Sequence, residues 1–396
     1  MQVEEPGDYQ AVADLIKKAS EEHRTVAPRG GGTMMDLGAP VPPADITVSS
    51  RNLCAVLDYQ PANLTVRTQA GITLGALNRA LGEHGQFLPL DAPFPDVATI
   101  GGIIATNTSG SLRVRFGTAR DQLIGLRAAL ADGQVVHGGG DVVKNVAGYD
   151  LPKLFIGSLG TLGMIVEATF KVAPLPAKRA TIAAGFEEMG PATALALRVL
   201  RSSMLPFGLE MLDRKASVEL GLGDRSLCVA RFGGVPGAVA QQIGQVEEWA
   251  VASGAADITI LDSDEKLWSR LRDFMFEKAT LVKIGVMPSQ VAQLAAQAQD
   301  YAARYGMGCV LLAHAIGIIY IALEGLPEGA VGAITLLRES ALACNGHLVV
   351  LRAPEELAKR VDVWGPAPRG LGLMKKLKQE LDPNGVLNPG RFVGGL

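Results

Sequence analysis

The sequence predicts an α+β protein of two domains, and three observations support this prediction. Up to Val172, short β-rich segments alternate with glycine-rich turns, a pattern typical of strands joined by close connections. Pro174 and Pro176 then interrupt the pattern and indicate a domain boundary. Beyond them the order β-α-β-β-α-β occurs twice, which is the order of a ferredoxin-like unit. We therefore expect three parts, over residues 1–176, 177–352 and, as a C-terminal segment, 353–396.

In the first domain, the pattern of apolar residues places the helices and strands in order. Apolar residues recur at helical spacing from Tyr9 to Glu22, and a second helix is expected from Thr73 to His84. The β-rich runs predict strands at residues 25–27, 46–48, 65–68, 123–130, 134–137 and 164–172.

The second domain repeats one order of elements. The first pass is a strand, a helix, two strands, a helix and a strand, over residues 181–186, 191–202, 207–212, 227–232, 238–252 and 257–261. A helix at 264–276 leads to the second pass, over residues 281–286, 289–305, 309–313, 318–322, 330–344 and 348–351. The uncharged run Met307–Leu323 is barely long enough for a membrane span and contains His314 and Gly317, so it predicts two strands that meet at a turn. A last helix, at 371–380, precedes the tail.

The composition is that of a chain with a full-sized core and no preference for polyanions. Hydrophobic residues make up 48% of the 396 residues, charged residues 19%, and the formal net charge is −3. With 37 basic and 40 acidic residues there is no basic surplus for nucleic-acid binding. The four cysteines are far apart, which excludes an iron–sulfur spacing and favours a reduced, intracellular setting. The N-terminus lacks the layout of a secretory signal, so we expect a cytoplasmic protein without a transmembrane segment.

Three clusters of the 47 glycines carry the candidate chemistry, and we expect uncharged loops there. The first cluster, Arg29–Thr33, follows a strand, and its backbone N–H groups could cradle a phosphate, although a tight surface turn explains it equally well. The second cluster, residues 98–110, combines small residues with hydroxyl and amide donors suited to a narrow slot around a planar, polar ligand. The third, residues 144–163, has Gly157, Gly160 and Gly163 one helical turn apart, which would let a helix pack against a ligand or against another helix.

Together these segments resemble a known flavoprotein family. The segments concerned are PRGGGT, ATIGGIIATNTSG, RFGTARDQLIGL, KNVAGYDLPKLFIGSLGTLG and the terminal LNPGR. They are similar to FAD-binding flavoproteins of the vanillyl-alcohol-oxidase/PCMH type (PCMH, p-cresol methylhydroxylase), and most similar to the GlcE-type FAD-binding subunit of glycolate oxidase (glycolate dehydrogenase). The resemblance implies a PCMH-type two-lobed FAD-binding domain, a cap domain built from the two ferredoxin-like units, and a C-terminal segment that returns to the FAD domain.

The resemblance also implies where the cofactor binds. The first cluster would contact the FAD pyrophosphate, the second would line the pyrophosphate and the ribityl chain, residues 160–165 would lie near the adenosine half, and the tail would reach the flavin edge. The residues expected to bind FAD are Pro28, Arg29, Gly30, Gly31, Gly32, Thr33, Thr99, Ile100, Gly101, Gly102, Thr106, Asn107, Ser109, Gly110, Gly160, Gly163, Ile165, Asn388 and Arg391. Many relatives tether the flavin through a His or Cys in the first loop. Residues 29–36 read RGGGTMMD, so we expect noncovalent FAD.

The expected cap differs from that of relatives that oxidise 2-hydroxy acids. Those relatives, including the GlcD-type subunit, carry an H-x-G-x-G-N-x-H stretch, often with E-H-G, whose histidines hold a metal or the substrate carboxylate. The nearest stretch here, His314–Tyr320, keeps one His and has Ile and Tyr in place of the Asn and the second His. No two of the five histidines have a metal-ligand spacing, so we expect no metal site. His314 is a core or hydrogen-bonded histidine, a catalytic base, or a residue with an interface or vestigial role, and His314 and Arg391 are the catalytic candidates.

Other charged residues have ordinary interpretations as well as functional ones. Arg113, Arg115 and Arg120 could bind a carboxylate or form surface salt bridges. The lysines of the last helix, Lys375, Lys376 and Lys378, predict a solvated helix face. The Glu of the family's GSEGTLG segment is replaced by Leu159.

Three functions are compatible with these residues. The first is the FAD-binding subunit of a complex that oxidises glycolate to glyoxylate, relaying electrons with a GlcD-type catalytic flavoprotein and a GlcF-type iron–sulfur subunit. In that case the chain is cytoplasmic or peripheral to the inner membrane through its partners. The second is a self-sufficient FAD-dependent dehydrogenase of a small 2-hydroxy acid such as D-lactate, with Arg and His residues of the cap holding the carboxylate. The third is a structural assembly subunit that FAD stabilises.

Overall fold

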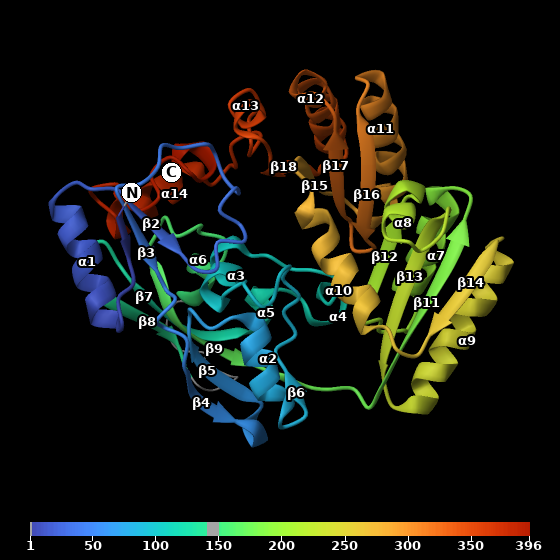
Figure 1. Cartoon of the computed structure of the whole chain (residues 1–396), viewed down its shortest axis with the longest axis horizontal. Coiled ribbons are helices and arrows are strands. Elements are labelled where there is room, and N and C mark those ends of the chain that lie inside the picture. Colours follow the sequence, from blue (N-terminus) through green and yellow to red (C-terminus); the bar gives the residue numbers. More distant parts are fainter. Residues whose placement is uncertain (1, 141–149) are drawn as a thin grey trace. The chain divides into compact units, whose positions relative to one another are not determined.

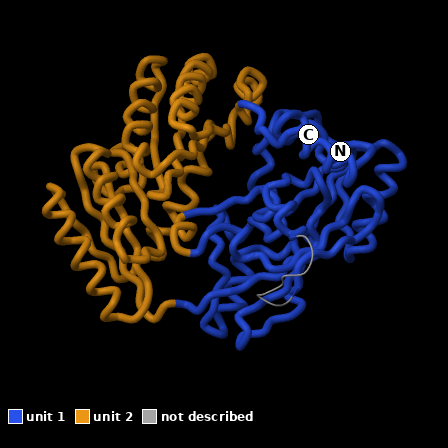
Figure 2. The backbone as a smooth tube through the Cα atoms, turned by 180° about the vertical axis from the view of Figure 1, so that it is seen from behind, with its two compact units in different colours: residues 1–110, 116–175, 366–396 blue, residues 111–115, 176–365 orange. Residues whose placement is uncertain are grey.

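The computed structural model describes residues 2–140 and 150–396, which divide into two compact units (Figures 1 and 2). Unit 1 consists of residues 1–110, 116–175 and 366–396, and unit 2 of residues 111–115 and 176–365. The C-terminal segment thus rejoins unit 1 at Pro366, later than the expected residue 353. Residues 353–365 stay with unit 2 because Leu357 and Val363 are buried in its core and the Val350 N–H donates to the Val363 carbonyl.

Unit 1 contains a parallel sheet and an antiparallel sheet. The parallel sheet has the order β1-β3-β2 and the antiparallel sheet the order β4-β5-β9-β7-β8. The strands are β1 (Gln2–Glu4), β2 (Val26–Arg29), β3 (Ile46–Ser49), β4 (Val56–Gln60), β5 (Thr65–Gln69), β7 (Leu123–Ala129), β8 (Val135–Gly139) and β9 (Met164–Lys171), and a short pair joins β6 (Gln86–Phe87) to β10 (Ala173–Pro174). The sequence pattern did not predict β1 and β4, which lie at sheet edges and have few buried residues.

Four helices of unit 1, α1, α2, α3 and α5, follow residues whose side chains accept hydrogen bonds from the first turn. Asp8 accepts from the Ala11 N–H at the start of α1 (Tyr9–Glu21), and Thr73 caps α2 (Leu74–Gly82) in the same way. The remaining helices are α3 (Ile100–Thr106), α5 (Ala119–Gln122), α6 (Pro152–Phe155) and α14 (Leu371–Leu381), and α4 (Arg113–Phe116) lies where the chain passes from unit 2 to unit 1.

Two glycine clusters differ from expectation in their secondary structure. Residues 100–106 form the helix α3 rather than a loop, because Thr99 caps the helix and Ile100, Ile103 and Ile104 bury one helical face. Conversely, residues 157–163 do not form a helix, since Gly157, Leu159 and Gly160 adopt positive φ angles of 77°, 53° and 71°.

Unit 2 is built on one eight-stranded sheet in the order β14-β11-β13-β12-β16-β17-β15-β18. Each half has the strand order of a ferredoxin-like unit, which confirms the predicted repeat. The strands are β11 (Lys178–Phe186), β12 (Gly208–Leu212), β13 (Ser226–Gly234), β14 (Asp257–Leu261), β15 (Leu281–Gly285), β16 (Gly308–His314), β17 (Ile318–Glu324) and β18 (His347–Arg352). The run Met307–Leu323 is therefore a strand pair, as its pattern predicts. The halves join through antiparallel pairing of β12 with β16, from Glu210 opposite His314 to Leu212 opposite Leu312.

Helices cover one face of this sheet and form the core of unit 2 (Figure 1). The helices are α7 (Met189–Leu200), α9 (Pro236–Ala252), α11 (Val291–Arg304) and α12 (Pro327–Ala343), and the chain also forms α8 (Arg214–Glu219), α10 (Glu265–Phe274) and α13 (Glu355–Ala358). Leu209 and Met211 belong to the helix-covered core, so alternation turns Glu210 to the other face of the sheet. On that face α10 packs through Trp268, whose indole N–H donates to the Thr181 hydroxyl (2.8 Å).

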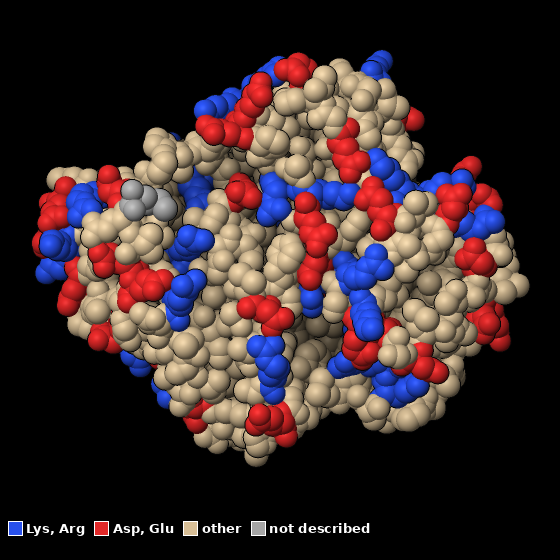
Figure 3. Space-filling view, in the orientation of Figure 1, with Lys and Arg blue, Asp and Glu red and all other residues tan. Residues whose placement is uncertain are grey.

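The surface carries both signs of charge. On the face shown in Figure 3, basic and acidic side chains are interspersed, and neither sign forms a continuous patch. Among the described residues, no helix has the length and apolar character that crossing a bilayer would require.

Candidate functional site

A pocket in unit 1 brings most of the predicted cofactor-binding residues together. It contains about 720 Å³ of empty space, part of it open to solvent. The described residues that line it are Pro28, Arg29, Gly30, Gly31, Gly32, Thr33, Met34, Met35, Ser50, Thr99, Gly101, Gly102, Ala105, Thr106, Leu159, Gly160, Gly163, Met164, Ile165, Asn388 and Arg391. They come from five separate stretches of chain: the end of β2 with the turn after it, the end of β3, the helix α3 with its cap, the segment that leads into β9, and the C-terminal tail.

The turn after β2 packs so closely against the start of α3 that only glycine fits. A Cβ on Gly30 would lie 2.0 Å from the Thr99 hydroxyl oxygen, and a Cβ on Gly31 would lie 1.8 Å from the Val97 carbonyl oxygen. The described residues offer no backbone acceptor to the N–H groups of residues 30–32. Free N–H groups beside glycines are suited to an anionic ligand such as a phosphate.

The helix α3 and the segment 157–165 form two further walls of the pocket. Gly101 is held by a hydrogen bond from its N–H to the Ala70 carbonyl (2.8 Å), and a Cβ there would lie 3.0 Å from Ala70 Cβ. The Leu159 N–H donates to the Ala105 carbonyl (2.8 Å), which ties the two walls together. The segment 157–165 therefore lies against α3 without being helical itself.

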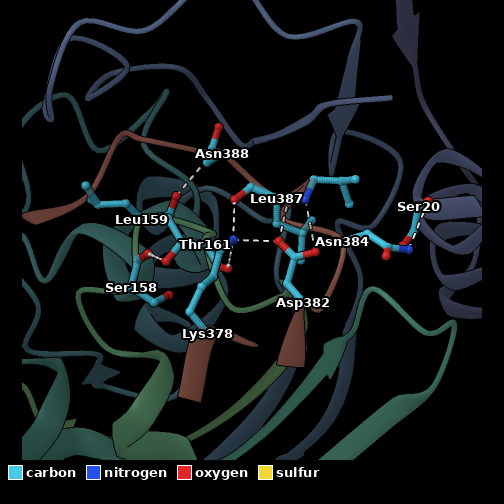
Figure 4. Close-up of polar contacts among 10 residues, drawn as sticks. Ser20, Ser158, Leu159, Thr161, Lys378, Asp382, Asn384, Leu387 and Asn388 are labelled. Atoms are coloured by element: carbon cyan, nitrogen blue, oxygen red, sulfur yellow. Dashed lines mark hydrogen bonds and ion pairs between the residues drawn. The ribbon is translucent and has the colours of Figure 1, made fainter. Parts of the chain in front are cut away.

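The C-terminal tail completes the pocket. The Asn388 backbone N–H donates to the Val26 carbonyl of β2 (2.9 Å), and the Asn388 side-chain amide donates to the Leu159 carbonyl (2.7 Å) (Figure 4). Asn388 is thus fixed between two walls at a φ angle of 42°. The tail reaches the pocket as the resemblance implies.

Arg391 lies in the pocket wall, where it holds a neighbouring loop. Its Nε donates to the Leu37 carbonyl (2.9 Å), and a terminal nitrogen donates to the carbonyls of Met34 (3.3 Å) and Met35 (2.5 Å). Burial lowers the pKa of Arg391, and the nearby Asp36 opposes this shift. As a catalytic candidate Arg391 is therefore already engaged in holding residues 34–37.

All but four of the predicted FAD-binding residues line this pocket. The exceptions are Ile100, Asn107, Ser109 and Gly110. Ile100 is fully buried in the core, and Asn107 ends α3 in the left-handed conformation, so the helix turns both away from the lining. A Cβ on Gly110 would lie 2.5 Å from the Asp91 carbonyl oxygen, so Gly110 packs against a different loop.

Sequence reasoning missed six lining residues. These are Met34, Met35, Ser50, Ala105, Leu159 and Met164. Met34, Ala105, Leu159 and Met164 each flank a residue that was predicted, and Met35 lies two residues after one, so proximity in sequence could have identified them. Ser50 carries no such signal, because it enters the pocket from the end of β3. Residues 144–149 of the third cluster lie outside the described residues.

In unit 2, His314 forms a buried pair with Glu210. His314 Nδ1 lies 2.7 and 2.6 Å from the two carboxylate oxygens of Glu210, and the exposed fractions of the two residues are 7% and 0%. One ring nitrogen of His314 is thus committed to both oxygens of the Glu210 carboxyl group. Nε2 is buried and has no partner among the described residues, and the Tyr320 ring meets the imidazole edge-on at 5.3 Å. His314 is thus a hydrogen-bonded core histidine with one unused ring nitrogen.

The three arginines near residue 115 do not share one unit. Arg115 donates to the Leu205 carbonyl (2.9 Å) and Arg113 lies near Lys283, all within unit 2, whereas Arg120 is exposed in unit 1.

Burial, with Arg113 nearby, lowers the pKa of Lys283 to about 8. Burial, Lys283 and Arg113 together lower the pKa of His347. No group of three or more His, Cys, Asp or Glu side chains suited to a metal ion occurs within residues 2–140 and 150–396.

The unit 1 pocket fits FAD on its own chemistry. It has a glycine turn with free N–H groups for a pyrophosphate, two arginines, and no acidic residue among the described lining residues. Its apolar lining residues, such as Met34, Met164 and Ile165, suit a planar ring system.

Comparison with known proteins agrees with this fit. A family model described as "FAD binding domain" matches residues 2–139, and one described as "FAD linked oxidases, C-terminal domain" matches residues 366–392. The chain is 26% identical to glycolate oxidase subunit GlcD of Bacillus subtilis, over 98% of this chain and 87% of the relative. It is 29% identical to D-lactate dehydrogenase of Archaeoglobus fulgidus (99% and 91%) and 30% identical to mitochondrial D-2-hydroxyglutarate dehydrogenase of Bos taurus (98% and 76%).

Solved structures identify the fold. The crystal structure of p-cresol methylhydroxylase with substrate bound superposes with a TM-score of 0.76 at 17% identity, over 98% of this chain and 88% of that chain. This likeness confirms the predicted two-lobed FAD-binding domain with a cap domain. The chain therefore belongs to the family of FAD-linked oxidoreductases that includes glycolate oxidase and D-lactate dehydrogenase, and it is an FAD-dependent oxidoreductase.

Proposed function

We propose that the chain is the GlcE-type FAD-binding subunit of a complex that oxidises glycolate to glyoxylate. The observation that carries this proposal is the pairing of His314 with Glu210 at the position where catalytic relatives are expected to have a pair of histidines. One histidine whose Nδ1 is committed to a buried carboxyl group is a poor substitute for a substrate- or metal-binding pair. The unit 1 pocket, by contrast, brings together most of the residues expected to bind FAD, which favours a chain that holds a flavin while a partner supplies the catalytic groups.

In this proposal the residues of unit 1 bind and orient noncovalent FAD. The lining of the pocket contains no His or Cys among the described residues, so no side chain there is suited to a covalent tether. FAD, when bound, supplies the hydride- and electron-accepting chemistry. The glycine turn at residues 30–32 would hold the pyrophosphate through backbone N–H groups, and Asn388 and Arg391 would fix the wall of the pocket at the flavin.

The partners in this proposal are a GlcD-type catalytic flavoprotein and a GlcF-type iron–sulfur subunit. The GlcD relative from Bacillus subtilis, a glycolate oxidase subunit, supports a setting of this kind. The four cysteines of the chain lack a cluster spacing, so onward electron transfer through an iron–sulfur group needs another chain. Any attachment to the inner membrane comes through these partners.

The test is to purify the chain from its native source by an affinity tag and to record both its partners and its spectrum. We expect a flavin spectrum, a second flavoprotein and a brown iron–sulfur protein in stable ratio, with glycolate oxidation by the complex. A tagged chain that is yellow, elutes alone and has no such partners contradicts the proposal.

A second function is favoured by a separate observation in unit 2. Burial and the nearby Arg113 lower the pKa of Lys283, and burial, Lys283 and Arg113 lower the pKa of His347. Such a group of basic side chains could hold the carboxylate of a small 2-hydroxy acid. We therefore keep, as the alternative, a self-sufficient dehydrogenase of a small 2-hydroxy acid such as D-lactate.

The two functions are distinguished by the isolated chain. The FAD-loaded chain is mixed anaerobically with glycolate or D-lactate, and the flavin absorbance is followed. The subunit proposal expects no bleaching on the time scale of turnover. Rapid bleaching that is lost in K283M but retained in K376M, an exposed lysine of α14, establishes the alternative instead.

A further inference from the structure

One lysine of the last helix is buried against expectation. Lys378 has an exposed fraction of 9%, whereas Lys375 and Lys376 on the same helix, α14, are exposed. The predicted solvated face is therefore wrong for Lys378. Burial lowers its pKa, and Asp382 opposes this shift. Burial of an ammonium group raises the free energy of the folded state unless its N–H donors are paired, so we expect hydrogen-bond partners around Lys378 Nζ.

Every donor of the Lys378 ammonium has a partner. Nζ donates to the Thr161 carbonyl (2.7 Å), the Leu387 carbonyl (2.8 Å) and Asp382 Oδ2 (2.5 Å) (Figure 4). Asp382, with an exposed fraction of 2%, also accepts from the backbone N–H groups of Val386 (3.0 Å) and Leu387 (2.8 Å). An ammonium has three N–H donors, so this buried pair is fully satisfied. It links α14, the tail and the segment 157–163.

Two of the linked segments are walls of the cofactor pocket. Thr161 follows Leu159 and Gly160, which both line the pocket, and Leu387 precedes Asn388, which lines it too. Asn388 in turn donates to the Leu159 carbonyl and to the Val26 carbonyl of β2, the strand that leads into the glycine turn at residues 30–32. The Lys378–Asp382 pair therefore lies directly behind the contacts that join the tail to the pocket.

These walls have a backbone conformation that requires support. Leu159 and Asn388 adopt positive φ angles of 53° and 42°, which cost free energy for residues with a side chain. Of the two carbonyls held by Lys378, that of Leu387 directly precedes Asn388 and that of Thr161 lies two residues after Leu159. The contact that fixes the strained backbone is thus supplied by a side chain that does not line the pocket.

We propose that Lys378, together with Asp382, is a positioning residue of the FAD site: it holds the segment 157–163 and the tail in the geometry that forms the pocket, without contacting the cofactor. The proposal depends on FAD binding in the unit 1 pocket and is independent of the substrate and of any partner. It makes FAD affinity depend on a side chain of the C-terminal helix.

The test compares K378M with K376M in the full chain. The apo-protein of each is titrated with FAD by flavin fluorescence, and the unfolding temperature of each apo-protein is measured separately. We expect K378M to weaken FAD binding by about tenfold, because two carbonyls and Asp382 lose their buried donor, while K376M stays within about twofold of the parent. A K378M protein with a lowered apo unfolding temperature but unchanged FAD affinity overturns the proposal, as does one in which neither changes.

A second variant and a measurement on the parent protein cover the case in which K378M does not fold. D382N keeps the shape of Asp382 and removes its charge, and we expect it to weaken FAD binding in the same direction. In the parent, FAD addition should slow amide exchange in residues 157–163 and 382–391 together. Protection of only one of these segments overturns the proposal. If the parent chain does not bind FAD at all, the proposed FAD site itself is wrong, and this result is distinct from an effect of Lys378.

Discussion

Single residues of the cofactor pocket are fixed by distances that leave no alternative side chain. Gly31 lies against the Val97 carbonyl, and Gly30 against the Thr99 hydroxyl, so the glycine turn and the start of α3 form one close contact. The N–H groups that this contact leaves free are the ones expected to bind the pyrophosphate. A change of one atom at this point therefore affects both packing and FAD binding.

We expect G31A to weaken FAD binding and to destabilise unit 1. The new Cβ would lie 1.8 Å from the Val97 carbonyl oxygen, and backbone must move to accommodate it. The matched control is G237A in α9, where nothing lies within 4 Å and where alanine should stabilise the helix by about 0.5–1 kcal/mol. FAD titration and urea unfolding of both variants measure the effects. Unchanged FAD affinity in G31A would show that this turn is not the phosphate cradle.

A substitution of His314 distinguishes the two proposed functions. If the chain only relays electrons, H314Q leaves glycolate oxidation by the complex within about threefold of the parent, because the base that takes the substrate proton lies in the partner. If the chain is itself the dehydrogenase and His314 is its base, turnover falls by about 10²–10⁴-fold. Steady-state rates of the purified complex decide between them, with a parallel unfolding curve as the control for lost stability.

At the scale of elements, the face of the unit 2 sheet opposite the helix-covered core carries a largely buried basic side chain that opposes folding. Lys283 on β15 lies opposite Tyr320 of β17, and Arg113 is the nearby charge that, after burial, lowers its pKa. Its pKa of about 8 lies below the ordinary value of 10.5. Below pH 8 the ammonium is charged in both the folded and the unfolded chain, and burial of the charge reduces stability. Between pH 8 and 10.5 the folded chain loses the proton first, so this cost disappears as the pH rises.

K283M should therefore be more stable than the parent at pH 7, by on the order of 3 kcal/mol, and the difference should shrink toward zero by about pH 10.5. Methionine has a similar volume and no charge, so packing changes little. Urea unfolding of both proteins at several pH values measures the difference. A constant difference across this pH range would mean that the charge of Lys283 is not its cause. If K283M is more stable than the parent but no longer binds a 2-hydroxy acid, this result indicates that Lys283 serves binding although it lowers the stability of the fold.

The elements of unit 2 could be predicted from the sequence, whereas parts of unit 1 could not. Regular alternation along β11, β13 and β17 and helical spacing in α11 and α12 indicate their structure because one buried face sets each pattern. The stretch 99–106 looked like a loop because glycines hid the apolar positions Ile100, Ile103 and Ile104 that make it a helix. In 157–163 the spacing of glycines suggested a helix, but the residues adopt positive φ instead, which glycine permits and spacing cannot reveal.

At the scale of the whole molecule, the cofactor site depends on contacts between distant parts of the chain. The glycine clusters could be assigned to one pocket because their residue types carry the signal. The buried pair behind that pocket could not, since Lys378 and Thr161 are separated by 217 residues and a lysine among lysines looks solvated. The seam of the eight-stranded sheet is similar: nothing local marks Glu210 as the partner of His314, 104 residues away. The chemical type of a residue can be read from the sequence at one position, but whether that residue is buried depends on segments far away in the chain.

The distribution of tryptophan offers a test of how FAD acts on the molecule as a whole. Trp249, Trp268 and Trp364 are the only tryptophans, and all three belong to unit 2, whereas every described lining residue of the FAD pocket belongs to unit 1. Indole fluorescence thus reports unfolding of unit 2, and flavin fluorescence reports release from unit 1. A ligand stabilises what it binds by RT ln(1 + [L]/Kd), about 2.7 kcal/mol at 100 times Kd.

Raising the FAD concentration should therefore raise the temperature of flavin release and shift the tryptophan transition less. Both signals are followed in one thermal scan at several FAD concentrations, with a protein carrying G31A as the control whose tryptophan transition should stay near that of the parent. Equal shifts of both transitions at every concentration would contradict this expectation, because they would mean that unit 2 either contacts the cofactor or unfolds together with unit 1. In that case FAD would stabilise the cap as well as its own pocket, and a flavin site could be retained for assembly even where a partner performs the chemistry.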